Sequence, residues 1–205
     1  MTGPRIRLYR PEDRAALFDV CVRTGLDGGD ARGVYADEDL LPAVFLAPYL
    51  DLEPELAFVL DRGDGVAVGY LVGTADTPAF AGRLRREYLP RVAGRFPAPP
   101  DPPTTPSEEM LTVLHAPEGM VRPEVAGYPA HLHIDLLPGH QRGGHGRALM
   151  TAYLAALAER AVPGVHLVMP SANRLARVFY DRLGFHDLGV EHPSVTYLAR
   201  AVDAG

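Results

Sequence analysis

The feature that most constrains the fold of this chain is the segment AHLHIDLLPGHQRGGHGRALMTAYLAALAER, residues 130–160. Its first eight residues alternate in polarity as a β-strand does, and Pro138-Gly139 ends that strand. A glycine-rich turn at residues 141–146 then opens a helix, whose apolar positions include Leu149, Tyr153 and Leu157 on one face. The segment therefore predicts a strand, a tight turn and a helix in immediate succession.

The glycine-rich turn is suited to hold an anion. The first turn of a helix leaves backbone N–H groups without partners, and the helix dipole adds partial positive charge there. Glycines at positions 143, 144 and 146 keep side chains away from those donors. The turn does not match the dinucleotide pattern G-x-G-x-x-G, and the P-loop is excluded because the chain contains no lysine.

Two separated blocks match one known family. Gln141, Gly144 and Gly146 fit the pattern [Q/R]-x-x-G-x-[G/A], and the second block is N-x-x-A-x-x-F-Y-x-x-x-G-F, running from Asn173 to Phe185. In this order the blocks resemble the GCN5-related N-acetyltransferases (GNAT), whose first block binds the pyrophosphate of acetyl-CoA. Further matches, DTPAF, LPRVAGRFP and HLHIDLLP, resemble the acetyltransferase-like C-terminal domain of O-GlcNAcase and its stand-alone bacterial relatives.

The resemblance implies a fold for this chain, and one segment of the chain is longer than that fold usually has. We expect one α/β (α+β) GNAT domain over residues 1–205, with a mixed central sheet of about seven strands flanked by helices. Residues 77–129 are much longer than the usual connection between the third and fourth strands. Apolar spacing predicts two helices there, separated by a proline-rich segment at 96–106. Long connections are usually functional or linkers, and we expect a lid beside the active site.

Composition sets the remaining expectations. The net charge of −6 gives no basic footprint for nucleic acid, and it slightly favours a cationic or neutral acceptor. No apolar run approaches the roughly 20 residues that cross a bilayer. The single cysteine, Cys21, fits a reducing compartment. We therefore expect a cytoplasmic bacterial protein, a monomer or homodimer, with no nucleic-acid or membrane partner.

By resemblance, acetyl-CoA is the cosubstrate and an unidentified amine is the acceptor. Backbone amides near Leu136 and Leu137 would polarise the thioester carbonyl. Asn173 would contact the pantetheine arm or cap its helix. Tyr180 would protonate the leaving thiolate, or else pack in the core. The pyrophosphate would be bound by Gln141, Arg142, Gly143, Gly144, His145, Gly146 and Arg147.

The base that takes the amine proton comes from the strand. His131, His133 and Asp135 share one face by alternation, and Asp135 is the first choice and His133 the second. A partly buried carboxylate has a raised pKa and becomes a better base near neutral pH. Asp135 could instead only orient a histidine or cap the turn.

Two other functions stay open. The run His131-x-His133-x-Asp135 resembles the metal-binding run of metallo-β-lactamase-type hydrolases, but Leu136 stands where that run needs a histidine. The chain could also bind acetyl-CoA as a sensor or interaction domain without turnover. We favour an N-acetyltransferase that uses no metal and transfers the acetyl group directly in a ternary complex, since Cys21 lies on the inner face of a predicted helix.

Overall fold

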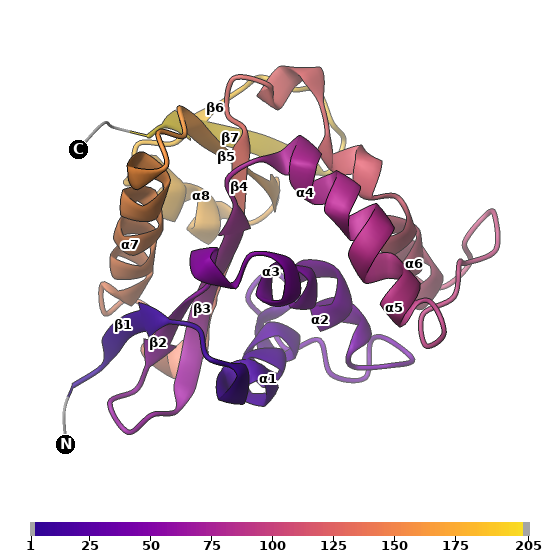
Figure 1. Ribbon diagram of the computed structural model, residues 1–205, viewed down its shortest axis with the longest axis horizontal. Helices are drawn as coiled ribbons and strands as arrows, with labels where there is room; N and C mark the ends of the chain where they lie inside the picture. Colours follow the sequence, from indigo (N-terminus) through magenta and orange to yellow (C-terminus); the bar gives the residue numbers. More distant parts are fainter. Residues whose placement is uncertain (1–2, 203–205) are drawn as a thin grey trace.

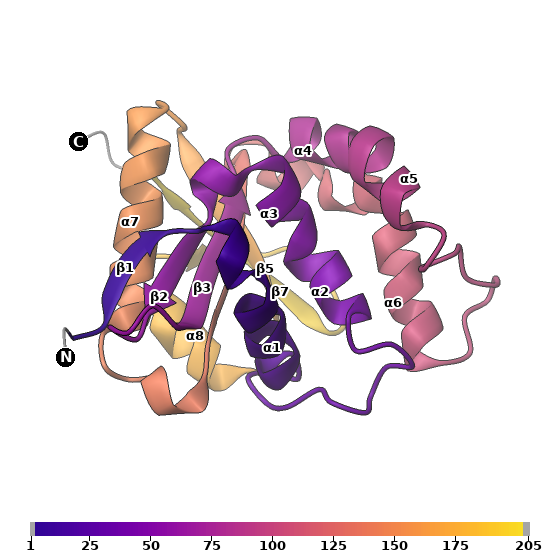
Figure 2. The same ribbon diagram turned by 60° about the horizontal axis from the view of Figure 1, so that its bottom comes forward.

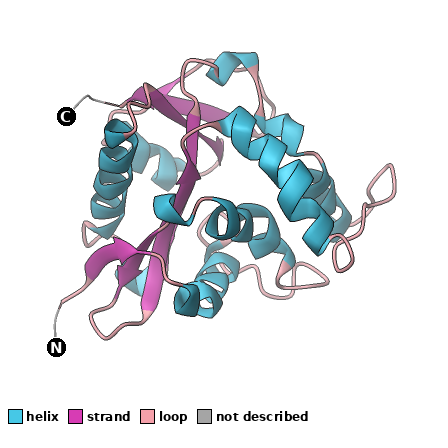
Figure 3. Ribbon diagram, in the orientation of Figure 1, coloured by secondary structure: helices cyan, strands magenta, loops and turns pink. Residues whose placement is uncertain are grey.

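The computed structural model describes residues 3–202 and contains one seven-stranded sheet in the order β1-β2-β3-β4-β5-β7-β6 (Figures 1 and 3). Every neighbouring pair is antiparallel except β4 and β5, so the predicted mixed sheet of seven strands is confirmed. The strands are β1 (Arg5–Leu8), β2 (Phe58–Asp61), β3 (Ala67–Thr74), β4 (Ala130–Leu136), β5 (Gly164–Pro170), β6 (His186–Asp187) and β7 (Val195–Ala201).

Helices cover both faces of the sheet (Figure 2). On one face, Tyr70 and Val72 of β3 pack with α1 (Arg14–Thr24), α2 (Leu40–Phe45) and α3 (Ala47–Leu52). On the other, Leu71 packs with α7 (His145–Glu159) and α8 (Arg174–Asp181). The period-two alternation of β3 thus supplies both cores. Helix α3 was not predicted, because Pro48 and the short apolar run at 46–50 gave no clear helical period.

The pairing of β4 with β5 ends almost at once. Only Ala130 with Val165 and His131 with His166 are in register, although both strands are seven residues long. Beyond His131 the two strands diverge, while β4 stays paired with β3 as far as Leu136. The sheet is therefore split at its centre, and β4 presents an unpaired edge to the gap.

The long connection between β3 and β4 is ordered. Its helical parts are α4 (Thr77–Arg83), η3 (Leu84–Tyr88), α5 (Leu89–Val92) and α6 (Pro106–His115), which confirms the two predicted helical segments and the non-helical stretch between them. Helix α6 begins with a capping box, in which Thr105 accepts from the Glu108 N–H and Glu108 accepts from the Thr105 N–H. The apolar side of the connection faces the core beside α2. Within residues 3–202, no helix combines the length and the apolar character needed to cross a bilayer.

A buried ionic cluster joins β1 to the turn after β2. The Arg7 guanidinium donates to Asp13 at 2.6 and 2.7 Å and to Asp61 at 2.9 Å. The Gly63 N–H and this guanidinium lower the pKa of the Asp61 carboxyl. Arg7 thus pairs with two carboxylates that are almost fully buried.

Arg7→Met is expected to lower the free energy of unfolding by about 2–3 kcal/mol at pH 7, because it leaves two buried carboxylates without their cation. Carboxyls with a lowered folded-state pKa stabilise the fold above about pH 4 and lose that effect as pH falls. Urea denaturation at pH 7 and pH 3.5 checks both expectations. Arg5→Met is the control, since Arg5 is exposed and its contact to Asp61 is 3.5 Å; equal losses from the two variants would contradict the cluster's role.

Candidate active site

The glycine-rich turn leads directly from β4 into α7. Gly144 precedes the helix with φ of 83°, a conformation that glycine adopts without strain. A Cβ on Gly146 would lie 3.1 Å from the Phe179 ring, so glycine permits close packing of α7 against α8. The Gln141 side chain donates to the Leu136 carbonyl at 2.9 Å and ties the turn to the end of β4. Gln141 is therefore a structural link here.

The amides of the turn are open. Among the described residues, none accepts a hydrogen bond from the backbone N–H groups of 142–147. Arg142 and Arg147 are exposed, and neither forms an ion pair within residues 3–202. The turn thus offers unpaired donors and two cations at a helix N-terminus, which is the arrangement that binds phosphates.

The edge of β4 carries further free amides. The Leu137 N–H donates to the Val68 carbonyl at 3.0 Å, so the expectation for Leu137 is not met: its amide is already used by β3. Antiparallel pairing sends alternate residues to the same neighbour, and the N–H groups of Ile134 and Leu136 consequently point toward the gap before β5. Ile134 was missed from the sequence, because the alternation did not reveal which residues bond to β3.

Two predicted residues come from α8. Asn173 caps the helix, since its Oδ1 accepts from the Ala176 N–H at 3.0 Å. The Tyr180 side chain is nearly buried beside Phe179 and Phe185, and its hydroxyl has no hydrogen-bond partner in the described part of the chain. Burial and the nearby Asp135 carboxylate raise the pKa of Tyr180, which keeps the phenol protonated.

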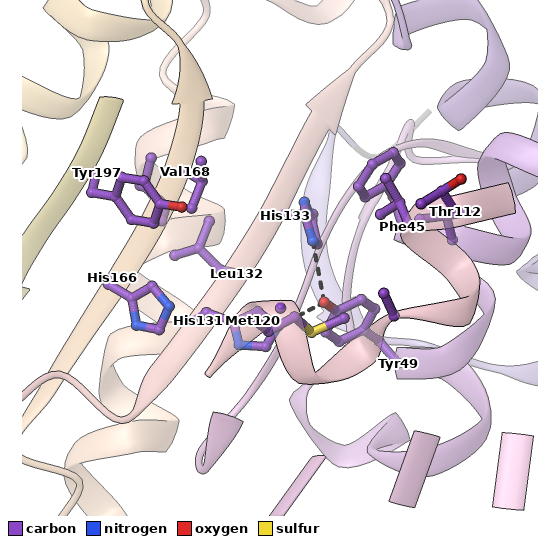
Figure 4. Close-up of a pocket in the computed structure, with 15 residues that line it drawn as sticks. Phe45, Tyr49, Thr112, Met120, His131, Leu132, His133, His166, Val168 and Tyr197 are labelled. Atoms are coloured by element: carbon purple, nitrogen blue, oxygen red, sulfur yellow. Dashed lines mark hydrogen bonds between the residues drawn. The ribbon is translucent and has the colours of Figure 1, made fainter. Parts of the chain in front are cut away.

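A cavity of about 410 Å³ opens in the gap between β4 and β5 (Figure 4). Its walls come from both diverging strands, from α2 and α3, and from the connection between β3 and β4. Labelled wall residues include Phe45, Thr112, Met120, His133, Val168 and Tyr197. Residues of α6 and of η4 (Pro117–Met120) thus form one wall, so the long connection helps to enclose the site.

A chain of hydrogen bonds links Thr77 to three side chains of the cavity wall. Thr77 Oγ1 lies 2.7 Å from the Pro129 carbonyl and 2.7 Å from His131 Nδ1. The Tyr49 hydroxyl lies 2.7 Å from His131 Nε2 and 3.2 Å from His133 Nε2 (Figure 4). The four side chains therefore connect a backbone carbonyl to a histidine in the cavity wall.

The direction of this chain assigns the histidine tautomers. A carbonyl only accepts, so Thr77 donates to Pro129 and accepts from His131 Nδ1–H. His131 Nε2 then accepts from Tyr49, whose oxygen accepts from His133 Nε2–H. His133 is left with a lone pair on Nδ1, which has no partner among the described residues. Burial lowers the pKa of His133 to about 4, so the ring is neutral at pH 7.

Asp135 lies on the same face of β4 but outside the cavity wall. Its carboxylate accepts from the Tyr70 hydroxyl at 2.7 Å, underneath α1. Burial raises the pKa of Asp135 to about 6, and the bond from Tyr70 opposes this shift. Cys21 is buried close by, and burial raises the pKa of its thiol to about 12, so it is a poor nucleophile.

The run His131, His133 and Asp135 is not arranged as a metal-ligand set. Both ring nitrogens of His131 are hydrogen-bonded, and Asp135 is bonded to Tyr70. Across residues 3–202 no group of three histidine, cysteine or acidic side chains is placed to hold a metal ion. The geometry therefore gives no support to a metallohydrolase.

Comparison with known proteins identifies a family for the segment that contains this site. The acetyltransferase (GNAT) family model matches residues 110–185, which include β4, the glycine-rich turn, α7, β5 and α8. Protein O-GlcNAcase of Rattus norvegicus is 26% identical over 187 residues, covering 89% of this chain and 20% of that protein. The chain thus spans about one fifth of the length of this relative.

Solved structures extend the likeness to the whole chain. The crystal structure of SsHAT is 58% identical with a TM-score of 0.96, and the match covers 98% of this chain and 100% of that one. The PaiA N-acetyltransferase of Thermoplasma acidophilum, solved with coenzyme A, is 12% identical with a TM-score of 0.57 over 98% and 99% of the two chains, a likeness of fold. The chain belongs to the GCN5-related N-acetyltransferase (GNAT) family.

Proposed function

We propose that this protein transfers an acetyl group from acetyl-CoA directly to an amine in a ternary complex. The observation that carries the proposal is the set of backbone amides without a partner among the described residues, at 142–147 of the turn and on the open edge of β4 beside the gap in the sheet. A diphosphate on the turn would let the pantetheine arm run along β4. The PaiA N-acetyltransferase, which shares this fold, was solved in complex with coenzyme A, and this supports a coenzyme A thioester as the cosubstrate.

The thioester would lie where its carbonyl accepts from an amide of β4. Ile134 and Leu136 supply the N–H groups on that side, and oriented amides stabilise the negative charge that develops on the oxygen. Tyr180, protonated and with no hydrogen-bond partner for its hydroxyl in residues 3–202, would donate its proton to the departing thiolate. The arginines at 142 and 147 would pair with the phosphates of the cosubstrate.

His133 is our proposed proton acceptor, and Asp135 is the alternative. His133 is in the cavity wall, its Nδ1 lone pair has no partner in the described part of the chain, and Tyr49 fixes its tautomer. Asp135 has the pKa nearer to neutral, but its carboxylate faces Tyr70 and α1. The acceptor amine would therefore approach through the cavity.

The pH dependence of kcat/KM separates these two bases. A base works deprotonated, so activity falls as pH drops through its pKa. With His133 as the base, the profile is expected to stay flat between about pH 5 and 8, since its pKa is about 4. A loss below pH 6 would instead match Asp135, whose pKa is about 6. The acceptor must be an amine that does not itself titrate in this range.

Two measurements test the proposed function itself. Calorimetry with acetyl-CoA is expected to show one site, and absence of binding would contradict the proposal. Release of free thiol from acetyl-CoA in the presence of amines is expected to show turnover. If acetyl-CoA binds but no class of amine is acetylated, the protein is better explained as an acetyl-CoA sensor.

A further inference from the structure

The cavity between β4 and β5 carries no charged side chain. Of the fifteen described residues that form its wall, none is aspartate, glutamate, lysine or arginine. The polar groups are three histidines, two tyrosines and one threonine. Burial lowers the pKa values of His131, His133 and His166, so all three are neutral at pH 7. No described residue of the wall therefore offers a carboxylate to a cation that enters the cavity.

A cation, paired with Glu124 at 3.4 Å, lies next to one wall residue of the cavity. The Arg122 guanidinium lies over the Tyr197 ring, 5.3 Å from its centroid, and Tyr197 is part of the wall. An alkylammonium buried without a counter-ion is strongly disfavoured. The described wall therefore offers a protonated lysine side chain no ion pair, although the whole chain carries a net charge of −6.

The apolar part of the wall is unusually exposed for its residue types. Val168 on β5 and Val113 on α6 are each 46% exposed, and both belong to the cavity wall. Figure 4 shows Val168 across the cavity from Thr112, the neighbour of Val113 in α6. Val168 is exposed because β4 has already diverged from β5 at that level. Exposed apolar side chains in a cavity wall favour binding of an apolar ligand group. Cavities of about 150 Å³ can hold benzene, so about 410 Å³ is ample for a substituted ring.

From this geometry, and resting on the proposed acetyltransferase function, we infer that the acceptor is a small arylamine: a flat apolar ring with an amino group that is uncharged at neutral pH. The ring would lie between Val113 and Val168, with the amino group toward His133 and Ile134. Helix α6 would form the wall on one side of the ring.

The chemistry balances with the groups present. The amine nitrogen attacks the thioester carbonyl, a C–N bond forms, and the C–S bond breaks to release the thiolate. His133 Nδ1 takes the proton from the nitrogen, and Tyr180 gives a proton to the thiolate sulfur. An arylamine needs only a weak base for this step, because its nitrogen becomes strongly acidic after attack. The products are an N-aryl acetamide and free coenzyme A.

The test compares three acceptors at pH 7: 4-methylaniline, its alkylamine homologue 4-methylbenzylamine, and Nα-acetyl-lysinamide. Release of thiol from acetyl-CoA gives kcat/KM for each. We expect 4-methylaniline to exceed 4-methylbenzylamine at least about 100-fold, since an alkylamine whose pKa lies two units or more above pH 7 is neutral in at most about one part in a hundred. Equal or faster acetylation of either alkylamine would overturn the inference and leave the proposed function intact.

The remaining outcomes are also decisive. Acetyl-CoA binding with no acetylation of 4-methylaniline would overturn the inference alone. Failure to bind acetyl-CoA would overturn both the proposed function and the inference. The two proposals therefore fail in distinguishable ways.

A variant of the wall locates the ring. Val113→Trp adds bulk from an exposed helix position into the cavity, and it is expected to raise KM for 4-methylaniline at least about tenfold without changing the affinity for acetyl-CoA. Val66→Trp is the matched control, since Val66 is 43% exposed and lies in the turn between β2 and β3. An unchanged KM in Val113→Trp would show that the ring does not bind in this cavity.

Discussion

Gly144→Val is expected to weaken acetyl-CoA binding by at least about 100-fold. Gly144 has φ of 83°, and a left-handed conformation costs an L-residue roughly 1–2 kcal/mol, more when the residue is β-branched. The turn would have to relax, which would misdirect the amides of 142–147. Each lost hydrogen bond to a charged phosphate is worth about 1.5–3 kcal/mol. Calorimetry with acetyl-CoA measures the change directly.

Gly139→Val is the matched control for this experiment. Gly139 lies in the same connection between β4 and α7, its φ is not in the left-handed region, and a Cβ there would meet no heavy atom within 4 Å. Its affinity for acetyl-CoA is expected to stay within about twofold of the wild type. Since Gly144 is exposed, both variants are expected to fold, and circular dichroism verifies this. Wild-type affinity in Gly144→Val would refute the placement of the diphosphate on this turn.

Tyr180→Phe is expected to lower kcat by about 100-fold or more while leaving the dissociation constant of acetyl-CoA nearly unchanged. A positioned general acid contributes typically about 10²–10⁴-fold, and only the hydroxyl is removed. That hydroxyl makes no hydrogen bond within residues 3–202, so its loss leaves no protein group unsatisfied. Steady-state kinetics and calorimetry on the same preparation separate turnover from binding.

Tyr35→Phe serves as the comparison for Tyr180→Phe. Tyr35 is a partly buried tyrosine that packs against the core on the α1 side of the sheet and is absent from the cavity wall. This variant is expected to keep wild-type kcat. If Tyr180→Phe also keeps it, Tyr180 is a core tyrosine and another donor protonates the thiolate. A rise in KM without a loss of kcat would assign Tyr180 to binding alone.

The local pattern of the chain predicted the framework of the site. The spacing of Gln141, Gly144 and Gly146 predicted an open turn before α7. This was possible because the conformational freedom of glycine and the free N–H groups at a helix start involve only a few consecutive residues. Alternation along β4 placed His131, His133 and Asp135 on one face for the same reason. The helices of residues 77–129 followed from apolar spacing. These features depend on near neighbours in the chain, which a sequence displays.

Only the tertiary structure decided how that framework is used. The Leu137 N–H, expected to be free, donates to Val68 on β3, and the same register directs the Ile134 N–H into the gap. The sequence could not show this, because strand register is set by pairing between residues far apart in the chain. Tyr49, 82 positions before His131, fixes the tautomer of His133, whereas Asp135 is bound to Tyr70. The net charge of the chain favoured a cationic or neutral acceptor. The described wall of the cavity carries no charged side chain, which favours a neutral one. The two differ because the net charge is a sum over all residues, whereas the wall consists of the few that the fold brings together.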